Sequence, residues 1–139
     1  MQTNPRTEQA GARWRVGIYA HDPSGRSGRA RLDRQAATLA AEVARQRGWR
    51  HVATYADHGG GRVRAGLCRL LADAPGHLDL VVVDAYGRLS NDRRQLAALM
   101  ARLGGAGVTV VVLRPAAGRR LARLVANLAL ADLVAGELR

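Results

Sequence analysis

Residues 78–83 read Leu-Asp-Leu-Val-Val-Val, an almost unbroken apolar run in the middle of a 139-residue chain. Such a run is typical of a strand that is covered on both faces of a parallel sheet. A second apolar run, Val-Thr-Val-Val-Val-Leu, fills residues 108–113. Between the two, Ser90 is a candidate N-cap, and apolar side chains then recur at helical spacing. That helical face consists of Leu96, Leu99, Met100 and Leu103. The stretch therefore predicts a strand–helix–strand unit.

The same alternation extends upstream. Residues 14–20 (Trp-Arg-Val-Gly-Ile-Tyr-Ala) and 51–55 predict two more strands, followed by Gly-rich loops at 22–28 and 57–63, the second of them mobile. A helix that ends at Gly48 is indicated by Leu32, Ala36, Leu39, Ala40 and Val43. A shorter helix that ends near Pro75 is indicated by Leu67, Leu70 and Leu71. We therefore expect an α/β fold, with a mostly parallel sheet of four to five strands flanked by helices.

The two ends of the chain differ from this core. Residues 1–12 are polar and predict a disordered leader, so the α/β domain is expected over residues 13–115. Residues 116–139 predict a long helix with two apolar groups that do not share one stripe. One group is Leu121, Leu124, Val125 and Leu128; the other is Leu130, Leu133 and Val134. A helix of this kind is expected to pack on its own domain and on a second subunit, as a homodimer or higher oligomer.

The charge of the chain favours a polyanionic partner. The 22 basic residues are all arginine, and the formal net charge is +11 at pH 7. An excess of this size favours nucleic acid, so DNA is the expected partner. No apolar run has the length of a signal peptide core or a membrane span, and we expect a cytoplasmic protein.

Cysteine and histidine give no sign of a metal or cofactor. The single cysteine, Cys68, lies in an apolar helical stretch and is expected to be buried. The four histidines have no metal-ligand spacing; they are His21, His51, His58 and His77. We expect neither a metal nor a cofactor.

Four short motifs resemble the catalytic domain of serine recombinases, the resolvase/invertase family. Residues 19–23 (Tyr-Ala-His-Asp-Pro) correspond to the family's Tyr-Ala-Arg-x-Ser, and residues 31–35 (Arg-Leu-Asp-Arg-Gln) to its Ser-Leu-x-x-Gln. Residues 64–67 match Arg-x-Gly-Leu. Residues 79–83 and 87–91 follow an Asp-x-x-x-x strand and an Asp-Arg-Leu-x-Arg exit. All four occur in the family's order.

The resemblance implies site-specific DNA strand exchange through a phosphoseryl intermediate, without a metal. Arginine suits this chemistry because its planar fork binds two phosphate oxygens and stays charged. We expect Arg64 and Arg88 to meet in one pocket beside the exit of the first strand. The candidate catalytic residues are His21, Ser24, Gln35, Arg64, Asp79 and Arg88.

Several family positions carry other residues. Pro23 stands where the family has its nucleophile, so Ser24 is the candidate nucleophile, with Ser27 the other hydroxyl of the loop. His21 and Asn91 each replace an arginine, and Gly87 replaces an aspartate. Removal of one electrostatic donor typically costs on the order of 10²–10³ in rate. We therefore expect catalysis to be weak or lost.

Three functions remain open from the sequence. The first is a degenerate recombinase domain that serves as a dimeric, DNA-associated module. The second is an active recombinase that uses Ser24. The third is a flavodoxin-like domain that binds a phosphorylated small ligand or a protein partner; no Gly-x-Gly-x-x-Gly motif follows the first strand to support a dinucleotide.

Overall fold

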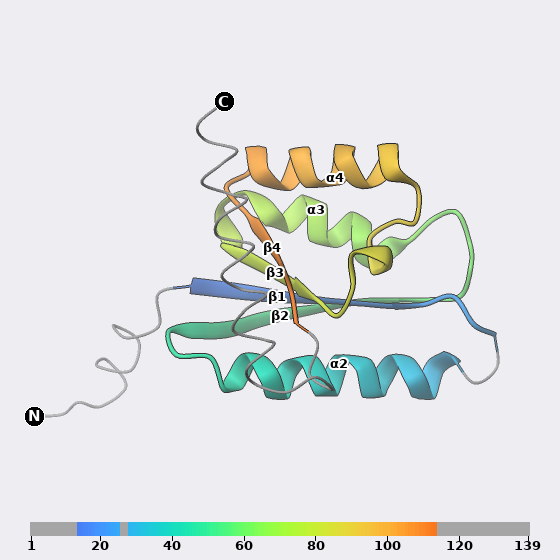
Figure 1. The fold of residues 1–139 in the computed structure, drawn as a ribbon, viewed down its shortest axis with the longest axis horizontal. Helices are drawn as coiled ribbons and strands as arrows, with labels where there is room; N and C mark the ends of the chain where they lie inside the picture. The colour runs from blue at the N-terminus through green and yellow to red at the C-terminus, as the bar shows by residue number, and fades with distance from the viewer. Residues whose placement is uncertain (1–13, 26–27, 114–139) are drawn as a thin grey trace, which may run out of the picture.

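The computed structural model describes residues 14–25 and 28–113, and Figure 1 shows their arrangement as a three-layer α/β domain. Along the chain, the elements are β1 (Trp14–Asp22), α2 (Gly28–Ala44), β2 (Trp49–His58), α3 (Ala65–His77), β3 (Leu80–Val83), the 3-10 turn η1 (Tyr86–Arg88), α4 (Arg93–Gly105) and β4 (Thr109–Val112). Within the described residues the sheet has the order β2-β1-β3-β4, and its pairings are parallel. The predicted α/β class and parallel sheet are confirmed.

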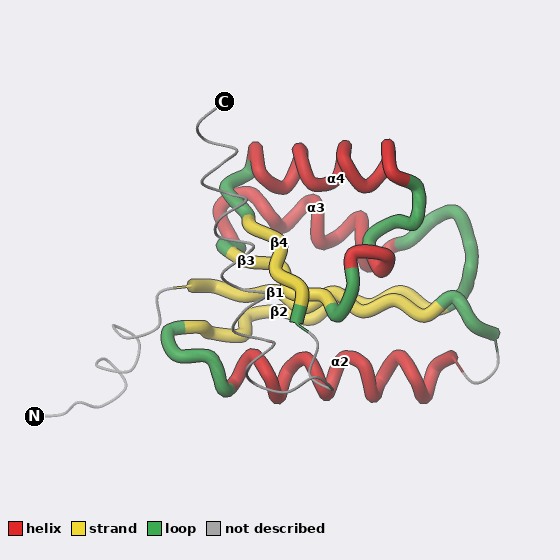
Figure 2. The backbone as a smooth tube through the Cα atoms, viewed as in Figure 1, coloured by secondary structure: helices red, strands yellow, loops and turns green. Residues whose placement is uncertain are grey.

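Helices cover both faces of the sheet, as Figures 1 and 2 show: α2 lies on one face, and α3 and α4 lie on the other. Successive strand residues point to opposite faces of the sheet and pack against the helices there. Val16, Ile18 and Val82 pack in the cluster with α2, whereas Tyr19 and Val81 pack in the cluster with α3 and α4. Because both faces of β3 are buried, its sequence reads as a continuous apolar run rather than an alternating one.

The first two strands are longer than the sequence predicts. β1 extends to Asp22, and β2 runs from Trp49 to His58. Asp57, expected in a mobile loop, is therefore a buried strand residue. The long β1·β2 register, from Trp14↔Trp49 to Asp22↔His58, carries both strand ends past the rest of the sheet. This extension of β1 and β2 places polar residues at the carboxyl edge of the sheet.

Two helix predictions need correction, and one is confirmed. The N-cap of α4 is Asp92 and not Ser90, since the Asp92 carboxylate accepts the backbone N–H groups of Arg94 and Gln95. Cys68 is exposed on α3 and not buried. The predicted end near Pro75 is confirmed, because Pro75 departs from helical geometry (ψ 121°).

Several predictions fall outside the described residues. They concern the leader at 1–12, the candidate hydroxyl of Ser27, and the helix expected at 116–139 with Leu130 and Val134. In the described part of the chain, no helix has the length and apolarity needed to span a membrane.

Candidate functional site

Polar side chains gather where the strands end. The carboxyl end of β1 carries His21 and Asp22, β2 ends in Asp57 and His58, and Asp84 follows β3 directly. Because parallel strands end at a common edge, these groups come together there, where open α/β sheets place their ligands.

Arg64, just before α3, reaches across this edge to the turn after β3. Its Nη1 donates to the carbonyl oxygen of Arg88 (2.9 Å) and to the hydroxyl of Tyr19 (3.3 Å). Its Nη2 donates to the carbonyl oxygen of Leu89. The Arg64 guanidinium therefore binds the η1 turn to β1, and this fixes the backbone that carries Arg88.

Arg88 binds a carboxylate with both arms of its fork. Its Nε lies 2.6 Å from one Asp84 oxygen and its Nη2 lies 3.2 Å from the other. Its Nη1 donates to the carbonyl oxygen of His21 (3.0 Å). The pKa of Arg88 is raised, first by the hydrogen bonds to Asp84 and also by the charges of Asp84 and Asp22. Arg88 is thus held in its charged form by acceptors of the protein itself.

His21 is the point where these groups meet. Its carbonyl accepts from Arg88, and its Nδ1 lies 3.4 Å from Arg64 Nη1. The side chain of Gln35 binds both backbone polar groups of His21. Its Oε1 accepts the His21 N–H (2.9 Å), and its Nε2 donates to the His21 carbonyl (3.4 Å). Arg64 and Arg88 therefore converge on the exit of β1, and Gln35 acts there as a positioning residue.

Asp22 organises the loop that carries Ser24. The buried carboxylate of Asp22 accepts the backbone N–H of Ser24 (2.8 Å) and the Nε of Arg31 (3.0 Å). The bonds from Ser24, and then the Arg31 guanidinium, lower the pKa of Asp22 to about 2. Within residues 14–25 and 28–113, no hydrogen bond joins Ser24 to Arg64 or Arg88.

The structure does not bring Asp79 to this edge. Asp79 precedes β3, at the opposite end of the sheet, and its carboxylate pairs with Arg15 at the start of β1 (3.0 Å to Nε). The Arg15 side chain lowers the pKa of Asp79. Asp79 is therefore a structural partner of β1, since a residue before a parallel strand cannot meet residues that follow it.

We expect Asp79→Asn to leave the carboxyl edge unchanged. Partly exposed ion pairs contribute little, so a modest fall in melting temperature is expected, together with unaltered amide resonances of His21 and Gln35. Circular dichroism melts and amide NMR spectra check both. Shifted resonances at the carboxyl edge without a loss of fold would return Asp79 to the site.

Two acidic residues of the site were missed from the sequence. Asp57 accepts the Tyr19 hydroxyl (2.7 Å) and the backbone N–H groups of Gly66 (2.7 Å) and Leu67 (2.9 Å). Burial, and then this bond to Asp57, raises the pKa of Tyr19. Asp84 had a usable signal, because it stands four residues before Arg88 and directly after an apolar strand.

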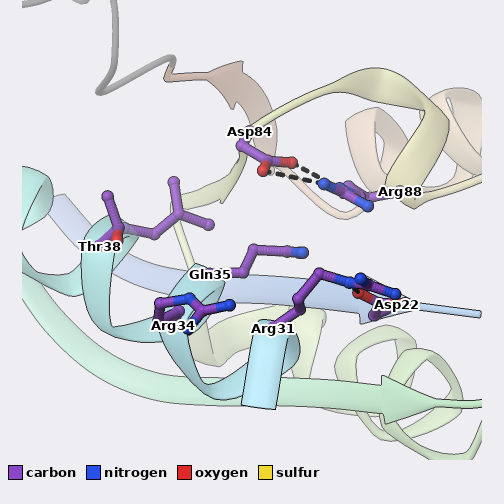
Figure 3. Close-up of a pocket in the computed structure, with 8 residues that line it drawn as sticks. Asp22, Arg31, Arg34, Gln35, Thr38, Asp84 and Arg88 are labelled. Atoms are coloured by element: carbon purple, nitrogen blue, oxygen red, sulfur yellow. Dashed lines mark hydrogen bonds and ion pairs between the residues drawn. The ribbon is translucent and has the colours of Figure 1, made fainter. Parts of the chain in front are cut away.

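A cavity of about 380 Å³ opens between α2 and the exit of β3. Figure 3 shows side chains of α2 on one side of it, with Asp84 and Arg88 facing them. Its lining consists of Asp22, Arg31, Arg34, Gln35, Thr38, Leu39, Asp84 and Arg88. Arg64 is not part of this lining, so the two expected guanidinium groups share His21 but only one borders the cavity. The described residues hold no cluster of three or more metal-ligating side chains.

Comparison with known proteins gives a consistent result. The family model "Resolvase, N terminal domain" matches residues 18–131. The C-terminal catalytic domain of ISC1926 TnpA, an IS607-like serine recombinase, is similar in structure with a TM-score of 0.64 and 24% identity, over 70% of this chain and 67% of that one. The N-terminal catalytic domain of TP901-1 integrase has a TM-score of 0.62 and 22% identity, over 90% and 98%.

A resolvase family site-specific recombinase from Streptococcus pneumoniae has a TM-score of 0.63 at 13% identity, over 91% of this chain and 92% of that one. At these identities the structural likeness establishes the fold. No curated protein matches the chain.

Proposed function

Because this chain belongs to the resolvase N-terminal domain family, we propose that it acts on DNA as a dimeric recombinase-type module whose strand-cleavage chemistry is weak or lost. In this proposal residues 13–115 form the DNA-associated domain and residues 116–139 the dimerisation helix. The net charge of +11 supports a DNA partner, since neutralisation of backbone phosphates dominates such affinity.

One observation carries the proposal: Arg31, Arg64 and Arg88 are bound to the protein's own acceptors. Cleavage of a phosphodiester without a metal needs cations that offset charge on the equatorial phosphate oxygens. Here Arg88 is paired with Asp84, Arg31 with Asp22, and Arg64 with two backbone carbonyls. A phosphate would have to displace these acceptors before it gained any stabilisation.

The replaced family positions point the same way. Pro23 has no nucleophile, and the nearest hydroxyl, Ser24, is tied through its backbone to Asp22 rather than to an arginine. A Cβ added at Gly87 would lie 2.8 Å from the Asn91 amide oxygen. Asn91 is exposed and can turn away, so the relevant change at these two positions is that neither Gly87 nor Asn91 carries a charge.

The test of catalysis is a search for the phosphoseryl adduct. Purified protein is incubated with supercoiled plasmid, and the products are separated on denaturing gels beside the Ser24→Ala variant. We expect no covalent protein–DNA adduct from either protein. An adduct that forms with the wild type and disappears in Ser24→Ala would overturn the loss of catalysis and make Ser24 the nucleophile.

The test of DNA association is its salt dependence. Each phosphate contact contributes a slope of about −0.9 to log K against log salt concentration. For a module that makes four or more contacts we expect a slope of about −3.6 or steeper. Anisotropy titrations of a labelled duplex over a range of salt concentrations measure it. Undetectable binding, or a flat response, would remove DNA as the partner.

A further inference from the structure

The cavity beside α2 has the composition of an anion site. Arg31 and Arg34 lie one turn apart on α2, and Arg88 faces them from the η1 turn (Figure 3). Arg34 is exposed, and it makes no ion pair within the described residues. Three guanidinium groups that border one cavity of about 380 Å³ make a strong local field for a negative ligand.

Two carboxylates occupy the positions that such a ligand would take. Asp84 engages Nε and Nη2 of Arg88, the same fork that binds two oxygens of a phosphate. Asp22 takes the Nε of Arg31 at 3.0 Å. The three arginines and two aspartates leave a net charge of about +1 on the lining, so the field available to a ligand is largely cancelled.

The two carboxylates differ in how firmly they are held. Asp22 is buried, with an 8% exposed side chain, and also accepts the Ser24 N–H. Asp84 keeps 26% of its side chain exposed, and Arg88, four residues along the chain, is its one hydrogen-bond or ion-pair partner among the described residues. Asp84 is therefore the carboxylate that can turn away when another acceptor approaches Arg88.

We propose that this cavity is a phosphate-binding site in which the Asp84 carboxylate competes with the ligand for the Arg88 guanidinium, while Asp22 occupies Arg31. A phosphate enters between Arg34 and Arg88 and displaces Asp84 from the guanidinium fork. Under the proposed function, on which this assignment of the source rests, the phosphate belongs to the DNA backbone. The cavity lies within the range of small-ligand sites, so a free phosphorylated molecule shares the same chemistry.

The test compares Asp84→Asn with Asp33→Asn. Both changes remove one negative charge and one ion pair, but Asp33 pairs with Arg29 on the exposed side of α2, outside the cavity lining. Inorganic pyrophosphate, titrated by calorimetry without added metal, is the first probe. We expect Asp84→Asn to bind it about tenfold more tightly than the wild type, or about 1.4 kcal/mol, and Asp33→Asn within about twofold of the wild type.

A second pair of variants tests which arginine is responsible for the increase in pyrophosphate affinity. In the Asp84→Asn background, Arg34→Gln should abolish the increase, whereas Arg47→Gln, an exposed arginine beyond the end of α2, should preserve it. Asp84→Ser, which removes the charge with a smaller side chain, replaces Asp84→Asn if that variant does not fold. Equal pyrophosphate affinities for the variants at 84 and 33 would overturn the proposal.

A DNA duplex is the second probe and separates this inference from the proposed function. If the gain at Asp84 appears with pyrophosphate but the duplex is not bound, the site stands and its ligand is a free phosphorylated molecule. If the duplex binds, but Asp84→Asn and Asp33→Asn have equal affinities for each probe, the DNA function stands. The proposal that Asp84 competes with a phosphate is then refuted.

Discussion

Gly66→Ala is expected to destabilise the domain by about 2 kcal/mol of unfolding free energy and to lower its melting temperature by about 8 °C. A Cβ at this position would lie 2.5 Å from the carbonyl oxygen of Ala56 and 3.0 Å from its nitrogen. Both atoms are backbone of β2, so no side-chain rotation relieves the clash. Overpacking of this kind costs about 3 kcal/mol, and alanine's better helix propensity returns at most about 1.

Gly104→Ala is the matched control, because it makes the same change in α4, where nothing lies within 4 Å of the added Cβ. There the propensity difference acts alone, and we expect a stabilisation of up to about 1 kcal/mol. Urea unfolding of the two variants and the wild type measures both effects. Equal stabilities of the two alanine variants would show that α3 is not packed on β2 as closely as described.

Gly66 marks the limit of what could be predicted about the fold from the sequence. The apolar runs at 78–83 and 108–113 predicted buried strands, since strands covered on both faces cannot alternate. The helical faces with Leu39 and Leu103 predicted the layers that cover them. These signals are local. The close approach of α3 to β2 depends on Gly66, ten positions after Ala56. The motif Arg-x-Gly-Leu marked Gly66 only through the family resemblance.

The site was less predictable, because its contacts are not local. Asp57 caps α3 from the end of β2, so the usual search for a cap immediately before the helix misses it. Asp79 was assigned by motif order, which carries no information about the end of the strand at which a residue stands. Arg88 was assigned correctly to the carboxyl edge because it follows its strand.

The arginines at this edge have two roles that the sequence does not distinguish. Arg64 binds backbone carbonyls and therefore holds the η1 turn, whereas Arg88 borders a cavity and pairs with a carboxylate. A substitution that removes the Arg64 side chain would therefore first displace the η1 turn and, with it, Arg88. The same dependence makes Asp57 important, because it fixes the start of α3 from which Arg64 extends.

Asp57→Ala is expected to cost about 3 kcal/mol of unfolding free energy. The change removes the acceptor of two N–H groups at the start of α3, a cap worth about 1 kcal/mol. It also leaves the fully buried Tyr19 hydroxyl without its acceptor, which adds about 2 kcal/mol. Denaturant unfolding measures the loss.

Asp92 and Tyr19 supply the controls that divide this loss into its parts. Asp92 also accepts two backbone N–H groups, at 2.9 and 3.0 Å, but it is exposed, so Asp92→Ala should cost only about 1 kcal/mol. In a Tyr19→Phe background no hydroxyl remains to be orphaned, and Asp57→Ala should then cost about as much as Asp92→Ala. If the loss at Asp57 were unchanged by Tyr19→Phe, the hydroxyl would contribute nothing. The charge of Asp57 at the helix start would then account for the whole effect.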